Sequence, residues 1–165
     1  MNKAIMRAIH FLLVLILVSP AILRLATAQT SRNSDIAVVV HPDTPVDDLS
    51  LADVRKVLLG DRQYWNSKLP VTLLIRAPVA REREVVLRVI YQMTEAQFKQ
   101  YWIAKIFRAE AASPPKIVYS NDMQLDLVAA IPGAIAFVDS RNVRPGLKVL
   151  RIDGHLPGEP GYPLH

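Results

Sequence analysis

Short runs of mostly apolar residues, separated by segments with helical periodicity, constrain the fold of this chain more than any other feature. The runs are IAVVV at 36–40, VTLLI at 71–75, KIV at 116–118, AIAFV at 134–138 and KVLRI at 148–152. An apolar run without polar alternation is typical of a strand that is covered on both faces. Strands that alternate with helices favour crossover connections. We therefore predict an α/β fold with a mostly parallel sheet flanked by helices.

The segments between these runs predict four helices. Each has a residue suited to cap or open it, and these residues are Ser50, Ala80, Thr94 and Ser120. Thr94 and Gln97 form a capping box. In the second helix, residues 81–84 and Arg88 are polar and predict its first turn and solvent side.

The N-terminus has the layout of a cleavable signal peptide. Lys3 and Arg7 precede an apolar stretch at 11–18, and Ala26-Thr27-Ala28 offers small residues for cleavage near Ala28. The alternative is a retained membrane anchor. It is disfavoured because a spanning helix needs about 20 apolar residues, and Ser19-Pro20 interrupts this run. We expect an exported protein.

Removal of residues 1–28 leaves 165 − 28 = 137 residues, which suits one domain. It also removes Lys3, Arg7 and Arg24, so the net charge falls from +5 to about +2. No block of basic residues remains, and we expect no binding of nucleic acid. The chain has no cysteine, so its stability must come from packing.

Sequence signatures of enzymes are missing from the chain. It has no cysteine nucleophile, no Gly-x-Ser-x-Gly elbow and no glycine-rich phosphate loop. After cleavage three histidines remain, without metal-ligand spacing. We expect no enzymatic activity, no metal and no cofactor. A hydrolase that uses clustered acids has no positive support in the sequence.

The end of the second strand is the most interesting place for a ligand. Arg76 leaves the predicted sheet, and a helix begins near Ala80, so Arg76 and Arg81 could converge on an anion. The alternative is a pair of solvated arginines that balance Glu82 and Glu84 across the first helical turn.

The order of these segments resembles the phosphate-type periplasmic substrate-binding proteins of ABC transporters, which have a type II periplasmic-binding fold. The matching stretches include IAVVVHPDTP at 36–45, LSLADVRKVLLG at 49–60, VTLLIR at 71–76 and VAAIPGAIAFV at 128–138. The resemblance implies one lobe of the two that such receptors have. It also implies a periplasmic location, a small oxyanion such as phosphate as ligand, and a membrane transporter or envelope protein as partner.

The chain departs from the family pattern in its oxyanion turn. Arg76 matches the family's arginine, but Ala80-Arg81-Glu82 stands where the family has Ser-Gly-Thr. Two hydroxyl donors are lost, and each hydrogen bond to a charged group contributes about 1.5–3 kcal/mol. We therefore expect weak or altered ligand binding. Ser120 and Asn121, at another helix start, are secondary candidates for the same cleft, and capping the helix is their structural alternative.

The sequence thus predicts a mobile lead-in at 29–35, a binding-protein-like domain at 36–153 and an irregular tail rich in proline and glycine at 154–165. The function expected first is that of an exported anion-binding protein related to phosphate transport. The alternative is an interaction module of the cell envelope that keeps the fold without binding phosphate. We interpret five aromatic residues as packing in the core or on the surface of the lobe, rather than stacking on a ligand: Trp65, Phe98, Tyr101, Trp102 and Phe107.

Overall fold

A computed structural model describes residues 34–165, so the predicted signal peptide and residues 29–33 of the lead-in lie outside the described residues. The elements in chain order are β1 (Ile36–Val40), β2 (Asp48–Leu49), α2 (Leu51–Leu58), β3 (Thr72–Arg76), α3 (Arg81–Val85), the π-helix η1 (Val86–Tyr91), α4 (Glu95–Phe107), β4 (Lys116–Val118), α5 (Asn121–Ala130), β5 (Ala134–Asp139), the 3-10 helix η2 (Ser140–Asn142), β6 (Lys148–Val149) and β7 (Arg151–Ile152).

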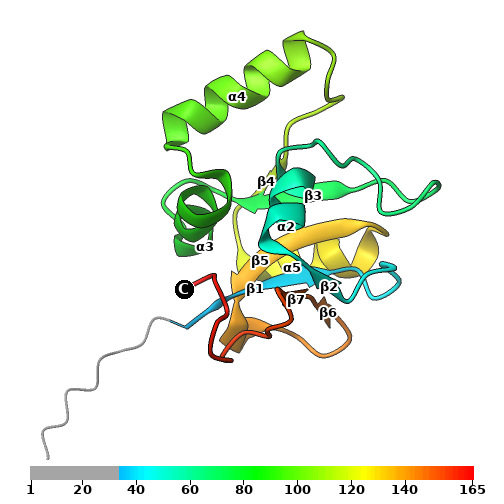
Figure 1. Cartoon of the computed structure of the whole chain (residues 1–165), viewed down its shortest axis with the longest axis vertical. Coiled ribbons are helices and arrows are strands. Elements are labelled where there is room, and N and C mark those ends of the chain that lie inside the picture. The colour runs from blue at the N-terminus through cyan, green and yellow to red at the C-terminus, as the bar shows by residue number, and fades with distance from the viewer. Residues whose placement is uncertain (1–33) are drawn as a thin grey trace, which may run out of the picture. The chain divides into compact units, whose positions relative to one another are not determined.

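Five strands form the main sheet in the order β4-β3-β5-β1-β6 (Figure 1). Strand β3 is parallel to both β4 and β5, whereas β1 is antiparallel to both β5 and β6. Strand β6 therefore points the same way as β5, and only β1 opposes the other four. The predicted α/β fold with a mostly parallel sheet is confirmed.

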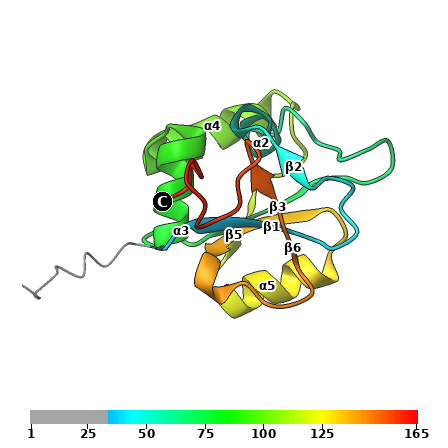
Figure 2. The same cartoon turned by 60° about the horizontal axis from the view of Figure 1, so that its bottom comes forward.

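Helices cover both faces of this sheet. Figure 2 shows α5 on one face and α2, α3 and α4 on the other. Strand β1 lacks polar alternation because both of its faces are covered. Ile36, Val38 and Val40 pack on the face covered by α2, α3 and α4. Ala37 and Val39 pack on the side of α5. Both faces of the strand are buried, as the sequence predicted.

The predicted helix caps are confirmed. The Ser50 hydroxyl accepts a hydrogen bond from the Asp53 N–H, and the Ser120 hydroxyl accepts one from the Met123 N–H. Thr94 and Gln97 form the reciprocal capping box at the start of α4. The second predicted helix is α3 continued by η1, and it ends at Gln92, whose φ is 54°.

The last predicted strand, at 148–152, divides into two. Residues of β6 pair with β1, and those of β7 pair with the short strand β2, which the sequence did not predict. The backbone N–H of Leu150, between them, donates to the Val38 carbonyl. A pairing of two residues on each strand is too short to leave a periodic pattern in the sequence.

The tail at 154–165 has no helix, and it packs on the domain. Tyr162 is 3% exposed and Leu164 is fully buried. The Tyr162 hydroxyl donates to the Ile36 carbonyl over 2.7 Å, and the Ile36 N–H donates to the Leu164 carbonyl over 2.7 Å. The tail therefore completes the core beside β1. Among residues 34–165, the helices are too short or too polar for any of them to span a membrane.

Candidate functional site

The carboxyl ends of three parallel strands meet at one edge of the sheet. Arg76 is the last residue of β3 and pairs with Val118, the last residue of β4, while Asp139 ends the neighbouring strand β5. Ser120 and Asn121 lie just after β4, at the start of α5, and Arg81 opens the helix that follows β3. The topology thus gathers the four residues predicted to bind a ligand near the edge where ligands bind in parallel α/β sheets.

Arg76 is the most unusual residue at this edge. Its Nε atom lies 3.8 Å from a carboxylate oxygen of Glu82, and both side chains are largely buried. The Nε and Nη1 atoms have no hydrogen-bond partner among residues 34–165. Burial of unpaired polar atoms is costly, and such atoms are rare in folded proteins. Arg76 therefore has unused hydrogen-bonding capacity at the strand end.

Arg81 donates a hydrogen bond to the Ser34 carbonyl over 2.5 Å, and its Nη1 atom lies 3.8 Å from the Asp139 carboxylate. Asp139 also accepts hydrogen bonds from the Arg141 side chain and from the Ser34 hydroxyl. The hydrogen bonds from Arg141, with that from Ser34, hold the pKa of Asp139 well below its usual range. Arg81 is therefore already engaged by acceptors of the protein itself.

The turn between β3 and α3 offers no side-chain donor. Ala80 is the cap residue of α3 and makes no side-chain hydrogen bond. The preceding residue, Val79, is fully exposed and has φ of 67°, which is unusual for a β-branched side chain. The structure therefore has no hydroxyl at the cap position where the resembled family has a serine.

Ser120 and Asn121 differ in whether their side-chain polar atoms have a hydrogen-bond partner. The Ser120 hydroxyl caps α5, which is the structural role that the sequence predicted for it. The Asn121 Oδ1 atom is buried and has no hydrogen-bond partner within the described part of the chain. Of the four predicted site residues, Arg76 and Asn121 thus carry unpaired buried atoms.

The sequence analysis placed Arg83 on the solvent side of its helix. This prediction is wrong, because the Arg83 side chain is only 3% exposed. It makes two hydrogen bonds of 2.8 Å to the Glu95 carboxylate and one of 2.9 Å to the Arg76 carbonyl, and it lies over the Phe98 ring. The hydrogen bonds from Arg83 lower the pKa of Glu95. Glu82, also assigned to the first turn and solvent side, is buried against Arg76.

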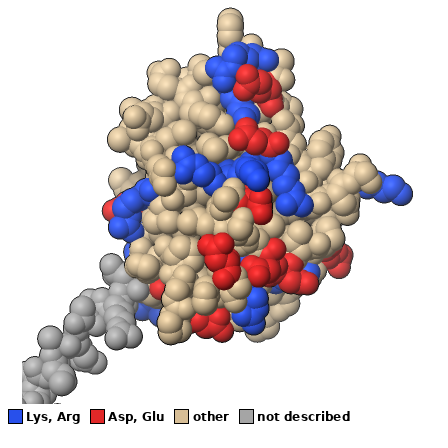
Figure 3. Space-filling model, in the orientation of Figure 1, with Lys and Arg blue, Asp and Glu red and all other residues tan. Residues whose placement is uncertain are grey.

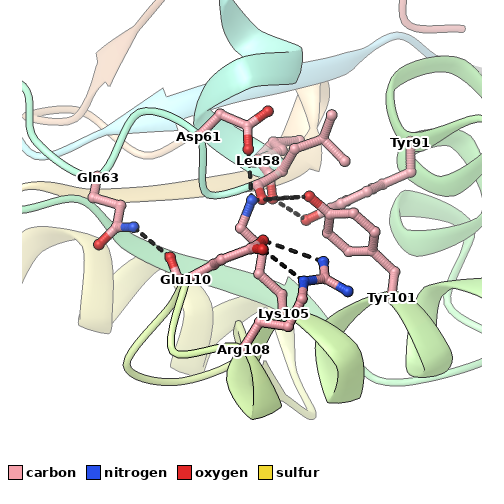
Figure 4. Close-up of polar contacts among 9 residues, drawn as sticks. Leu58, Asp61, Gln63, Tyr91, Tyr101, Lys105, Arg108 and Glu110 are labelled. Carbon is pink, nitrogen blue, oxygen red and sulfur yellow. Dashed lines mark hydrogen bonds and ion pairs between the residues drawn. The ribbon is translucent and has the colours of Figure 1, made fainter.

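A second polar cluster lies between α4 and the loop after α2, and the sequence analysis did not find it (Figure 4). Lys105 is buried and donates to the Asp61 carboxylate over 2.5 Å and to the Tyr101 hydroxyl over 3.1 Å. Burial lowers the pKa of Lys105, but the hydrogen bond to Asp61 and that to Tyr101 outweigh this effect and raise it. Asp61 and Lys105 are 44 residues apart, so no local pattern links them.

The charge distribution on the face seen in Figure 3 is mixed, because Lys and Arg side chains lie beside groups of Asp and Glu. Within residues 34–165 no three or more histidine or acidic side chains are placed to hold a metal ion.

Comparison with solved structures finds proteins with the same arrangement. An ABC-type phosphate transport receptor from Vibrio cholerae aligns over 75% of this chain and 48% of its own length, at 17% identity and a TM-score of 0.61. A putative phosphate ABC transporter substrate-binding protein from Clostridium perfringens, solved with bound phosphate, aligns over 73% of this chain and 46% of its own length, at 18% identity and a TM-score of 0.59. The chain shares the fold of these phosphate receptors.

PstS from Borrelia burgdorferi gives the same result, with 13% identity and a TM-score of 0.58 over 75% of this chain and 49% of its own length. The chain thus spans less than half of each of these phosphate receptors. No protein-family model and no curated protein matches it by sequence. At these identities the likeness concerns the fold, and the resemblance to phosphate receptors is confirmed at that level.

Proposed function

We propose that the protein is an exported binding protein that takes up a small oxyanion weakly through Arg76. One observation carries this proposal, namely the two buried guanidinium nitrogens of Arg76 that have no hydrogen-bond partner among residues 34–165. A guanidinium presents donors in a fixed fork that matches phosphate and carboxylate oxygens. An oxyanion at the carboxyl end of β3 would accept hydrogen bonds from this guanidinium. The expected location is the periplasm.

Three features of the site support weak binding. Glu82 places a carboxylate 3.8 Å from Arg76, where it repels an incoming anion. Arg81 already interacts with Ser34 and Asp139. The cap residue Ala80 has no donor side chain.

Calorimetric titration of the folded protein with phosphate and with sulfate tests the proposal. We expect a submillimolar to millimolar dissociation constant that weakens at least about tenfold in Arg76→Ala, which removes a charged hydrogen-bond donor. Arg88→Ala is the matched control, because Arg88 is exposed and, among residues 34–165, donates only to the His165 carbonyl. Absence of heat with both anions at millimolar concentrations would overturn the proposal. No catalytic turnover of the anion is expected.

A second candidate function, an interaction module of the cell envelope, is favoured by the outer face of α4. Ile103, Ile106 and Phe107 are spaced as neighbours on one helical face and are exposed, Phe107 to 92%. Exposed apolar side chains grouped in this way are typical of protein contact sites. Crosslinking in intact envelopes tests this second function by comparing the crosslinked products of the wild-type protein with those of Phe107→Ser. A product that is identical in both would contradict a role for this face.

A further inference from the structure

A cavity lies at the amino ends of β3 and β4, at the far end of these strands from Arg76. Its volume is about 240 Å³. Thr72 and Leu73 of β3 and Lys116 of β4 line it, together with the loop after α2 and the loop before β4. Gln63 donates a hydrogen bond of 2.7 Å to the Glu110 carbonyl and ties these two loops together (Figure 4).

Polar and apolar groups contribute about equally to the lining of this cavity, and its apolar part is well supported. Val57, Val71, Leu73 and Trp102 form this apolar part, and both Val57 and Trp102 are buried in the main core. Trp102 is in edge contact with the rings of Phe98 and Tyr101. An engineered apolar cavity of about 150 Å³ binds benzene, so this cavity has room for a ring or a short aliphatic chain.

Two cations at this cavity, Arg62 and Lys116, form no direct ion pair with an acidic side chain of residues 34–165. No aspartate or glutamate is among the residues that line the cavity. Lys105, close by on α4, differs because Asp61 neutralises it (Figure 4). The residues that line the cavity therefore carry a net positive charge, which favours an anionic ligand.

Arg62 is also fixed in position before any ligand arrives. Its Nε atom donates to the Tyr64 carbonyl over 3.2 Å, and its Nη2 atom donates to the Trp65 carbonyl over 3.1 Å. Its guanidinium lies 5.6 Å from the centre of the Trp65 ring. A cation held in this way loses little conformational entropy on binding, which favours affinity. The hydroxyls of Thr72, Ser113 and Tyr64 add donors to the lining.

We propose that this cavity binds a small carboxylate with an apolar body, of the size of benzoate or hexanoate. The apolar body contacts Trp102, Val71 and Leu73, and the carboxylate is recognised by Arg62 and Lys116. This cavity is separate from the site at Arg76. The cavity lies at the amino ends of β3 and β4, whereas Arg76 lies at the carboxyl end of β3. This inference does not depend on the oxyanion function proposed above.

Calorimetric titration of the whole protein with benzoate and hexanoate tests the inference, with benzamide as the neutral analogue of benzoate. We expect both carboxylates to bind and benzamide to bind at least about tenfold more weakly, since it lacks the charge. The double variant Arg62→Gln/Lys116→Gln should lose about tenfold in benzoate affinity. Lys99→Gln, at an exposed position on α4, is the matched control and should leave it unchanged.

Two further variants make the result specific to this cavity. Ser113→Trp, at an exposed residue of the lining, should block benzoate, whereas Arg76→Ala should leave benzoate binding intact. Equal affinity for benzoate and benzamide, or a double variant that is folded and binds as the wild type does, would overturn the inference. So would the absence of heat from either carboxylate at millimolar concentrations.

Discussion

The Nε atom of Arg76 lies 3.8 Å from the Glu82 carboxylate, close enough for electrostatic attraction and too far for a hydrogen bond. Both side chains are largely buried, and Arg76 belongs to the strand end while Glu82 lies in the first turn of the following helix. The carboxylate of Glu82 therefore balances the charge of Arg76 without satisfying its N–H groups. An oxyanion that binds Arg76 has to compete with an anionic group of the protein itself.

The first prediction follows from this competition. Glu82→Gln should raise the affinity for phosphate about tenfold or more, because it removes a negative charge beside the binding arginine. Two unit charges about 4 Å apart interact with about 4 kcal/mol at an effective dielectric constant of 20. Removal of only a part of this repulsion therefore accounts for a gain of about tenfold in phosphate affinity. The same change should make the free protein less stable, because Arg76 loses its counter-charge.

Calorimetry with phosphate, together with urea melts with and without phosphate, measures both effects. Glu84→Gln is the matched control, because Glu84 is the exposed acid of the same helix. A phosphate affinity that falls in Glu82→Gln would contradict competition, and it would indicate instead that Glu82 helps to position Arg76.

The strands and helix caps could be predicted because they depend on residues close together in the sequence. The run at 36–40 and the capping box at Thr94 are local patterns. The position of Arg76 could be predicted in the same way, since it follows from the end of an apolar run. The environment of Arg76 could not, because Glu82 was expected to face solvent and nothing in the polar run RERE distinguishes its buried members from its exposed ones.

The polar contacts that cross the fold were missed for the same physical reason. Arg83 is buried because Glu95 and Phe98 of the next helix receive it, and the sequence does not show which face of α3 meets α4. Lys105 depends on Asp61, 44 residues away. Phe107 was expected to pack and is exposed, because α4 ends there and the chain turns away through Ala109, whose φ is 56°. Tertiary neighbours decide these side chains.

The second prediction concerns Gly133, which precedes β5 with φ of 81°. A Cβ atom at this position would lie 2.1 Å from the Pro70 carbonyl oxygen. The Gly133 carbonyl also accepts hydrogen bonds from the Trp65 indole and the Thr72 N–H, so the backbone cannot move away freely. We expect Gly133→Ala to destabilise the domain by more than about 3 kcal/mol.

Gly146→Ala is the control for conformation alone. Gly146 has φ of 90°, and a Cβ atom there would meet nothing within 4 Å. Its substitution should cost only the strain of a left-handed backbone, about 1–2 kcal/mol. Equal losses of unfolding free energy in the two variants, measured by urea melts, would show that the clash with Pro70 is relieved.

The third prediction compares two aromatic residues of α4. Trp102 is 4% exposed and lies in the main core, so Trp102→Ala should destabilise the domain by about 3–5 kcal/mol. Phe107→Ala, on the outer face of the same helix, should change the unfolding free energy by less than about 0.5 kcal/mol. Urea melts distinguish them. A loss of stability below 1 kcal/mol for Trp102→Ala, roughly a third of the smallest expected value, would contradict the burial of that ring.

The last prediction is the pH dependence of the contact between Arg83 and Glu95. The hydrogen bonds from Arg83 lower the pKa of Glu95 below its ordinary value of 4.5. Because the folded pKa is lower than the unfolded one, the stabilisation is fully present above the unfolded value and is lost as the pH falls through the folded value. About a third of the Glu95 side chain is exposed, so solvent screening limits the contribution to about 1–2 kcal/mol.

Urea melts of the wild type and Glu95→Gln should therefore differ at neutral pH and converge as the pH falls below 4.5. Some acid sensitivity should persist in the variant, because the pKa of Asp139 is lowered as well, chiefly by the hydrogen bonds from Arg141. A stability difference between the two proteins that stays constant down to strongly acidic pH would mean that Arg83 is held by Phe98 and the Arg76 carbonyl, and that the charge of Glu95 contributes nothing.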